Sequence, residues 1–313
     1  KGLEHLFELL LRSRRRHGVG DVESRQGRGG VNAAVTPVDK TLPADLLQVG
    51  ILQVGPALHA LGDVIAVFPR VVTGEFAALG IDSTPGATPG HLRVQSSDVG
   101  NVASSEAFQS GRCTIQGDTA GAAVQLLAPA AGERILDLCA APGGKSVGIA
   151  ASGAHVTALD LNAPRIAKAR DAFDRLKPAG TLRLAAMDGT SGLKPGTLFD
   201  AALLDAPSSN TGVLAQRPAA RWRYGPSSLR ELREIQARLL DECAAHVRQG
   251  GRMVYSTCSL EPEENGQQMR AFLERHPGWT AGPSREHLPL PDPANPDRPA
   301  PVDGGFAALL QRS

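Results

Sequence analysis

The sequence predicts an α/β fold, a mostly parallel sheet with helices on both faces. From Glu133 onward, short apolar runs alternate with longer segments of helical periodicity. Acidic residues stand at the ends of several of these runs, where they would meet at one edge of a sheet. Strands and helices that alternate at this spacing form units whose crossover helices cover both faces of a parallel sheet.

Each predicted strand is a short apolar run bounded by turn residues. These runs are 134–138, 155–160, 182–188, 199–207 and 252–258, with a last strand near 304–312 that returns to the sheet edge. Helical periodicity and end signals predict the helices between them. One helix follows the loop 139–146. The others span 163–177, 227–251 (closed by Gly250 and Gly251) and 262–277.

The composition is that of a globular chain with reduced thiols. Apolar residues make up 42% and charged residues 21% of the 313 residues, which is ordinary for such chains. No apolar run reaches the ~18 residues of a membrane span, and the net charge of +1 gives no general attraction to polyanions. The four cysteines lack paired or metal-ligand spacing, which favours intracellular thiols over disulfides.

The N-terminal third has weaker patterns. A short amphipathic helix is predicted over 3–12, and the end of another at 76–81. The arginine cluster at 12–16 favours a solvated face over a binding patch. Lys1, rather than Met, opens the sequence, so we expect a fragment of a longer chain.

Four acidic residues fall at or near the carboxyl ends of successive predicted strands: Asp137, Asp160, Asp188 and Asp205. In open α/β sheets, ligands bind beyond these ends, where the strand order reverses. Aspartate is common in turns, so one such residue would carry little information. Four in succession indicate a binding site at this edge.

The loop 139–145 (CAAPGGK) follows the first strand. Lys145 and Ser146 after a glycine suit a phosphate loop, but that motif needs glycine where Cys139 stands, and GxGxxG is absent. What remains is a tight turn whose glycines let the backbone approach a ligand, or a purely structural turn. Asp160 follows by about 20 residues, the position of an acid that binds ribose hydroxyls, with a helix cap as the alternative. The glycine loop and Asp160 together favour a nucleoside-containing cofactor without a pyrophosphate.

Cys258 ends the predicted strand 252–258 among small residues. A thiolate at the open end of a strand can attack an electrophilic carbon in a neighbouring pocket. Asp205, two residues before Pro207, would supply an acid to the same pocket. An inert strand-end cysteine is the alternative.

Five blocks resemble, in order and spacing, the RsmB/Nop/NSUN family of RNA cytosine-C5 methyltransferases. They are LDLCAAPGGKS, ALDLNAPRI, MDGT, LLDAPSSNTGV with RW downstream, and YSTCSLEPEEN. FQSGRCTIQGD (108–118) resembles the segment that leads into their catalytic domain, and the closing DGGFAALLQR resembles their last hairpin. The resemblance is to bacterial members that act on 16S rRNA, and it covers about 92–312.

The resemblance implies a class I S-adenosylmethionine-dependent methyltransferase fold, Rossmann-like, with a seven-stranded, mostly parallel sheet. It also implies three regions. These are a divergent or truncated N-terminal region over 1–90, for which an RNA-binding remnant is one interpretation, a lead-in segment over 91–132, and a catalytic domain over 133–313.

The implied cofactor is S-adenosyl-L-methionine, and no metal is expected. The residues that would hold its methionine and ribose portions are Cys139, Ala140, Ala141, Pro142, Gly143, Gly144 and Lys145. Asp160 would bind the ribose hydroxyls, Asp188 would lie beside the adenine, and Asp205 near the methyl donor and the target base. By resemblance, Cys258 is the nucleophile that adds to cytosine C6, with Asp205 as the second catalytic residue.

The implied substrate is a single-stranded or loop cytosine in ribosomal RNA, because the base must be unstacked to be reached. Arg217, Arg221, Trp222 and Arg223 would hold phosphates or stack on bases, or form a solvated loop. We expect a cytoplasmic protein, a monomer, with no membrane contact.

Ser208 departs from the family pattern, which has a cysteine after the DAP motif. That second cysteine is thought to assist release of the methylated base, and a serine hydroxyl is a far weaker acid than a thiol. Slow release is therefore one hypothesis. Replacement of the thiol by another group is a second, and a catalytically impaired RNA-binding or assembly factor that keeps the cofactor pocket is a third.

Overall fold

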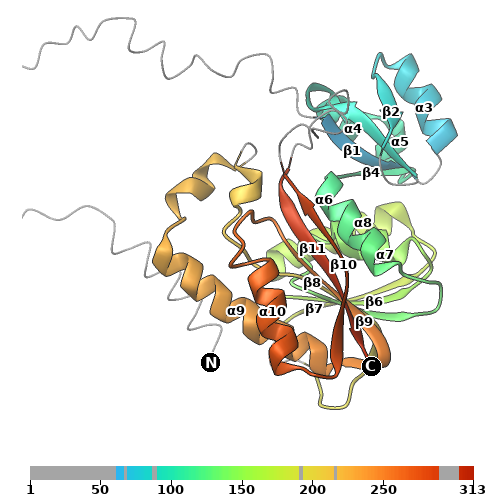
Figure 1. The fold of residues 1–313 in the computed structure, drawn as a ribbon. Helices are drawn as coiled ribbons and strands as arrows, with labels where there is room; N and C mark the ends of the chain where they lie inside the picture. The colour runs from blue at the N-terminus through green and yellow to red at the C-terminus, as the bar shows by residue number, and fades with distance from the viewer. Residues whose placement is uncertain (1–60, 67–68, 87–89, 190–192, 215–216, 289–302) are drawn as a thin grey trace, which may run out of the picture. The chain divides into compact units, whose positions relative to one another are not determined.

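The computed structural model describes residues 61–66, 69–86, 90–189, 193–214, 217–288 and 303–313 (Figure 1). All of them belong to one unit of the chain, residues 59–313. The helix predicted over 3–12 and the arginine cluster at 12–16 lie outside the described residues. None of the described helices is both long and apolar enough to cross a membrane.

A small antiparallel sheet precedes the main one. Its strand order is β2-β3-β1-β4, and the strands are β1 (Leu61–Ala66), β2 (Ser83–Pro85), β3 (His91–Gln95) and β4 (Cys113–Gln116). Its helices are α3 (Pro69–Ala78), the 3-10 turn η2 (Ser96–Asp98), α4 (Val99–Ser104) and α5 (Glu106–Gln109). Phe76, Val94 and Val102 are fully buried in its core. The predicted boundary at residue 90 stays a prediction; strands from both sides of it pair in this sheet.

The main sheet has seven strands in the order β10-β11-β9-β8-β5-β6-β7. They are β5 (Arg134–Leu138), β6 (His155–Asp160), β7 (Thr181–Ala186), β8 (Phe199–Asp205), β9 (Val247–Thr257), β10 (Trp279–His287) and β11 (Gly305–Arg312). The first five pair in parallel, and β10 and β11 are antiparallel. The predicted seven-stranded, mostly parallel sheet is confirmed.

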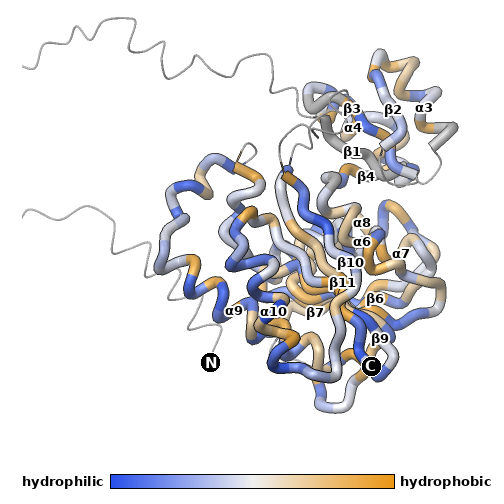
Figure 2. Tube along the Cα trace, viewed as in Figure 1, coloured by the Kyte–Doolittle hydropathy of each residue, from blue (hydrophilic) through white to orange (hydrophobic). Residues whose placement is uncertain are grey.

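Helices cover both faces of this sheet (Figure 1). One face carries α6 (Asp118–Leu127), α7 (Gly144–Ala150) and α8 (Ala163–Leu176), and the other carries α9 (Pro226–Ala245) and α10 (Gly266–Arg275). The 3-10 turns η3 (Thr211–Val213) and η4 (Pro218–Trp222) lie between β8 and α9. Strands covered on both faces are apolar along their length, and the central strands are accordingly hydrophobic (Figure 2).

Two predicted elements need correction. The helix predicted over 227–251 ends at Ala245, and β9 already begins at Val247. Gly250 and Gly251 lie inside β9, where the register with β8 shifts between Phe199 and Ala201. Buried Val247 pairs with Phe199, and this pairing overrides the helix signal of the preceding residues.

The last strand, β11, does not lie at the sheet edge. It pairs with β9 on one side and with β10 on the other. The edge strand is β10, Trp279–His287, which the sequence analysis did not predict because its residues beyond Trp279 are mostly exposed and polar. The helix predicted from 262 begins at Gly266, because residues 261–265 form turns first.

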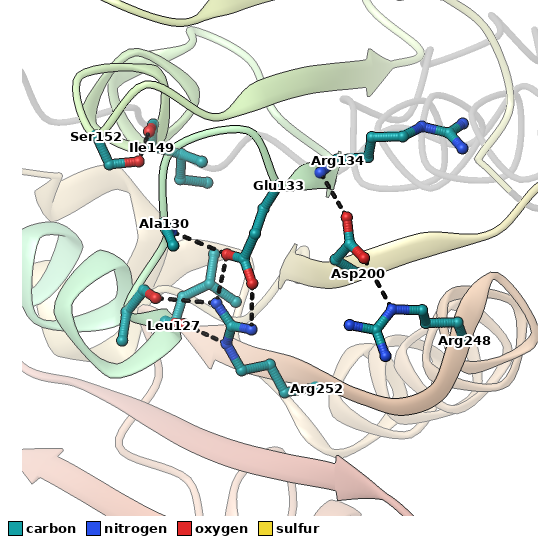
Figure 3. Close-up of polar contacts among 10 residues, drawn as sticks. Leu127, Ala130, Glu133, Arg134, Ile149, Ser152, Asp200, Arg248 and Arg252 are labelled. Carbon is teal, nitrogen blue, oxygen red and sulfur yellow. Dashed lines mark hydrogen bonds and ion pairs between the residues drawn. The ribbon is translucent and has the colours of Figure 1, made fainter.

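Arg252 links several segments at the end of the sheet opposite the carboxyl ends of the parallel strands. Arg252 makes two hydrogen bonds to the Glu133 carboxylate, at 2.8 and 2.7 Å, and also donates to the carbonyl oxygens of Leu127 and Ala128 (Figure 3). The pKa of Glu133 is lowered, chiefly by the hydrogen bond from Arg252. Nearby, Arg248 makes a single contact with Asp200 at 2.8 Å and is about half exposed.

We expect Arg252→Met to lower the free energy of unfolding by about 2 kcal/mol, because four charge-assisted bonds are lost from a partly buried site. Arg248→Met, the matched control, should cost under about 1 kcal/mol. The pKa of Glu133 is lower in the folded protein than its ordinary value of 4.5 in the unfolded chain. Its contribution to the free energy of unfolding is therefore present above pH 4.5 and is lost as the pH falls below that value. Urea unfolding at pH 7 and pH 3.5 measures this. Equal losses for both variants at pH 7 would contradict it.

Candidate active site

The carboxyl ends of five parallel strands bring the predicted site residues to one edge of the sheet. The loop 139–145 follows β5, Asp160 ends β6, Asp188 follows β7, Asp205 ends β8 and Cys258 follows β9. The sheet continues from β5 in both directions, toward β6 and toward β8. Such a reversal of strand order is where open α/β sheets bind ligands.

The loop after β5 makes a turn that its sequence dictates. Cys139 has a φ of 63° and Gly143 a φ of 98°, both in the left-handed region. A side chain on Gly143 would bring its Cβ to 2.2 Å from the Cβ of Ala169 in α8, so only glycine fits. Strained non-glycine residues such as Cys139 concentrate at ligand sites.

Asp160 holds this loop against the end of β6. Its Oδ2 accepts a hydrogen bond from the Ala141 N–H at 2.9 Å, and its Oδ1 accepts one from the Asn162 N–H at 2.8 Å. Arg165 donates to the Ala141 carbonyl oxygen at 2.6 Å. Because a carboxylate can accept about four hydrogen bonds, Asp160 keeps acceptor capacity for a ligand beyond these two.

Asp137, at the end of β5, is fully buried. The Ser146 hydroxyl donates to its Oδ2 at 2.5 Å, while its Oδ1 has no hydrogen-bond partner among the residues that the structure describes. Burial raises the pKa of Asp137 to about 7, against the opposing effect of the Ser146 bond. A buried acceptor without a partner is costly unless a ligand or a proton satisfies it.

Lys145 and Asp205 form an ion pair at 2.7 Å that joins the loop after β5 to the end of β8. The Ser256 hydroxyl, from β9, donates to the other oxygen of Asp205 at 2.7 Å. Burial lowers the pKa of Lys145, but Asp205 and Cys258 outweigh this, so the net shift is upward. Lys145 therefore stays positively charged between the loop after β5 and the end of β8.

Cys258 lies within the electrostatic reach of this pair. The pKa of its thiol is raised, first by burial and then by Asp205, while Lys145 and Arg217 lower it. The side chain is half-buried, and the Gly212 N–H fixes its backbone by donating to the Cys258 carbonyl oxygen at 3.0 Å. A raised pKa keeps this thiol protonated at neutral pH, so it would need a base that removes its proton to act as a nucleophile.

Asp188 and Ser208 lie at the same edge of the sheet. Asp188 follows β7, next to Met187, whose N–H donates to the Asp160 carbonyl oxygen at 3.0 Å. The Ser208 carbonyl oxygen accepts a hydrogen bond from the Asn210 side chain at 2.7 Å.

Sequence reasoning missed two residues of this edge and one contact of a predicted residue. Lys145, whose role in cofactor binding stays a prediction, donates to Asp205. Ser256 was not singled out, although its place two residues before Cys258 puts it on the strand that pairs with β8. Glu264 belongs to the block YSTCSLEPEEN, but no role was predicted for it, and the structure buries it fully.

The family model described as 16S rRNA methyltransferase RsmB/F matches residues 124–290, more than half of the chain. The chain belongs to the RsmB/F family. The matched segment of the RsmB/F domain runs from α6 past β10, so it contains the loop after β5, Asp205 and Cys258.

Curated RsmB/F relatives agree with this assignment. Two proteins named ribosomal RNA small subunit methyltransferase B, from Yersinia pseudotuberculosis and Yersinia pestis, are each 40% identical over 199 residues. The match covers 59% of this chain and 45% of each relative. The chain therefore spans less than half the length of the curated relatives it matches.

Solved structures agree with the fold of this RsmB/F chain. The structure of PH0851 is 26% identical with a TM-score of 0.72, and the match covers 81% of this chain and 60% of that one. NSun6 from Pyrococcus horikoshii, solved with SFG, has a TM-score of 0.70 at 17% identity, covering 82% and 92%. The predicted class I methyltransferase fold is confirmed.

Proposed function

We propose that this chain transfers a methyl group from S-adenosyl-L-methionine to C5 of a cytosine in RNA, with 16S rRNA as the substrate. The observation that supports it most is the grouping of Cys258 with the Lys145–Asp205 pair at the carboxyl edge of the sheet. Membership of the RsmB/F family and the names of the Yersinia relatives support the ribosomal substrate. A cytoplasmic location and a monomeric state stay predictions.

The residues at this edge suit S-adenosylmethionine, which supplies a methyl group on a positively charged sulfur. The buried Oδ1 of Asp137, for which the described part of the chain offers no hydrogen-bond partner, suits a cationic donor such as the ammonium group of this cofactor. Asp160 has acceptor capacity for ribose hydroxyls, and the loop 139–145 is tight enough for its backbone to approach a ligand. Asp188, which follows β7, would lie beside the adenine.

Cys258 and Asp205 perform the chemistry on the base. Cytosine C5 is too poor a nucleophile to accept a methyl group directly. Addition of the Cys258 thiolate to C6 breaks the C5–C6 double bond and makes C5 enamine-like, while Asp205 protonates or hydrogen-bonds N3. C5 then bonds to the methyl carbon as the methyl–sulfur bond breaks, which leaves a neutral thioether. A base removes the C5 proton, the C5–C6 double bond re-forms, and the Cys258 thiolate leaves.

The segment Arg217–Tyr224 has the composition of a single-stranded RNA contact. Trp222 is 83% exposed and Tyr224 is 44% exposed, and Arg221 and Arg223 are exposed beside them. Arg217 lies close enough to Cys258 to lower the pKa of that thiol. Exposed aromatic rings stack on bases, and arginines bind the phosphates between them.

Trp222→Ala should weaken binding of a single-stranded RNA containing cytosine by about tenfold, because stacking contributes roughly 1–3 kcal/mol per base. The matched control is Leu198→Ala, another exposed apolar side chain, just before β8. Fluorescence anisotropy with labelled RNA at fixed salt measures both variants. An unchanged affinity for Trp222→Ala would assign the segment to a solvated loop.

Ser208 replaces the cysteine that assists release in the family, so we expect the wild-type chain to release its product slowly. Ser208→Cys should raise steady-state turnover by about tenfold or more, within the range of proton-transfer catalysis. The measurement is the number of labelled methyl groups transferred per enzyme, with Ser227→Cys in the first turn of α9 as control. Many methyl groups per wild-type enzyme, with no gain in Ser208→Cys, would show that another group replaces the thiol.

The function is tested by transfer of labelled methyl groups from S-adenosylmethionine to unmodified 16S rRNA, followed by digestion to nucleosides. The proposal predicts label in 5-methylcytidine. Label in another nucleoside would favour a methyltransferase of the same fold that does not need a nucleophile. RNA binding without any transfer would favour the impaired assembly factor, the second function that Ser208 supports.

A further inference from the structure

A buried glutamate connects the loop that follows Asp205 with the loop that begins at Cys258. Glu264 is fully inaccessible to solvent and lies between β9 and α10. It ends a turn in which its own N–H donates to the Glu261 carbonyl oxygen at 3.0 Å. We call residues 206–210 the β8 loop and residues 258–265 the β9 loop.

Four hydrogen bonds saturate the Glu264 carboxylate. Its Oε1 accepts from the Ser209 N–H at 2.9 Å and from the Gln236 side-chain amide at 2.8 Å. Its Oε2 accepts from the hydroxyls of Ser209 and Ser259, each at 2.5 Å. Among the described residues Glu264 forms no ion pair, so its buried carboxylate is stabilised by neutral donors alone. Each of the four hydrogen bonds is then needed to offset the cost of burying the group.

The donors come from three separate elements. Ser209 belongs to the β8 loop, Ser259 to the β9 loop and Gln236 to α9. Gln236 also donates to the Pro207 carbonyl oxygen at 2.9 Å, so it holds the β8 loop a second time. The carboxylate therefore fixes both loops against one helix.

These contacts lie next to the groups that react. Ser259 directly follows Cys258, and Ser209 lies four residues after Asp205. The Ser259 hydroxyl, while donating to Glu264, also accepts from the Glu261 N–H at 3.0 Å, so its position is set from both sides. A shift of Ser259 would move Cys258 relative to Asp205.

We infer that Glu264 is a positioning residue that sets the separation of Asp205 and Cys258 for the proposed methyl transfer, on which this inference rests. Displacements of about 1 Å between reacting groups can cost about a hundredfold in rate. An amide in place of the carboxylate keeps the shape but offers one acceptor oxygen, and its NH2 group would face donors. One pair of contacts would then open, and the two loops would separate.

The test is Glu264→Gln against Glu263→Gln, the adjacent glutamate, which makes no hydrogen bond or ion pair among the described residues. We expect Glu264→Gln to lower kcat for RNA methylation by about 10- to 100-fold, with KM for RNA and Kd for S-adenosylmethionine unchanged. It should also change the rate at which iodoacetamide alkylates Cys258. Glu263→Gln should match wild type in both. Wild-type kcat in Glu264→Gln, or a loss confined to KM, would overturn the inference.

Ser259→Ala is the second variant, since it removes one donor and leaves the carboxylate in place should Glu264→Gln fail to fold. It should lower kcat in the same direction, and the double variant should be no slower than Glu264→Gln alone, because both changes break one network. Multiplicative losses would overturn the inference. If the wild-type chain transfers no methyl group, the proposed function fails. The alkylation rates then test the inference alone: unequal rates for Glu264→Gln and Glu263→Gln support a role of Glu264 in positioning Cys258, and equal rates overturn that role.

Discussion

Cys258→Ala abolishes methyl transfer to RNA on our account, a loss of at least about 10³-fold, because covalent addition to the base is the step that activates C5. Binding of S-adenosylmethionine should be unchanged, since the residues proposed to bind the cofactor are the loop 139–145, Asp160, Asp188 and Asp205, and Cys258 is not among them. Labelled methyl transfer and calorimetric titration with the cofactor measure the two properties in one preparation.

Cys243→Ala is the matched control. Cys243 is a fully buried cysteine of α9, and burial raises its pKa above the usual range, so it has no role as a nucleophile. We expect wild-type transfer from this variant, with at most a small loss of stability. Substantial transfer by Cys258→Ala would exclude the covalent route.

Asp205→Asn is the second change with a large expected effect. It removes the charge that pairs with Lys145 at 2.7 Å and accepts from Ser256 at 2.7 Å. On the proposed mechanism it also removes the group that protonates or hydrogen-bonds N3 of the base. We expect transfer to fall by about 10²- to 10⁴-fold, the range of general acid–base catalysis.

The same variant should make Cys258 more reactive toward alkylation at neutral pH. Asp205 raises the pKa of the Cys258 thiol, and Lys145 lowers it. Without the carboxylate the pKa of Cys258 falls, so more thiolate is present at a given pH and the pH–rate curve for iodoacetamide shifts to lower pH. A curve that shifts to higher pH would contradict the arrangement of charges described above.

Sequence patterns located the strands β5 and β6 to the residue, because each is a short apolar run between turn residues. They also located the strand-end acids, since the carboxyl ends of parallel strands must share one edge. The start of β9 was not predictable in this way. Gly250 and Gly251 have the pattern of a helix end, and only the pairing of Val247 with Phe199 shows that they lie inside a strand, where its register shifts.

The contacts of the site were less predictable than its residues. Lys145 pairs with Asp205 across 60 positions of sequence, and Glu264 accepts from Ser209 across 55. Neither partner follows from local spacing, because both depend on the order in which β5, β8 and β9 pair. Buried polar residues such as Glu264 therefore need the fold before their role can be inferred.

Trapping the covalent complex tests the central claim most directly. RNA with 5-fluorocytosine at the target position, given together with S-adenosylmethionine, presents a C5 that has no proton to lose, so elimination of the enzyme cannot follow methylation. The account predicts a complex that survives denaturing electrophoresis, with the nucleotide attached to the peptide that contains Cys258. Methylation of ordinary RNA without such a complex, or attachment through another cysteine, would contradict it.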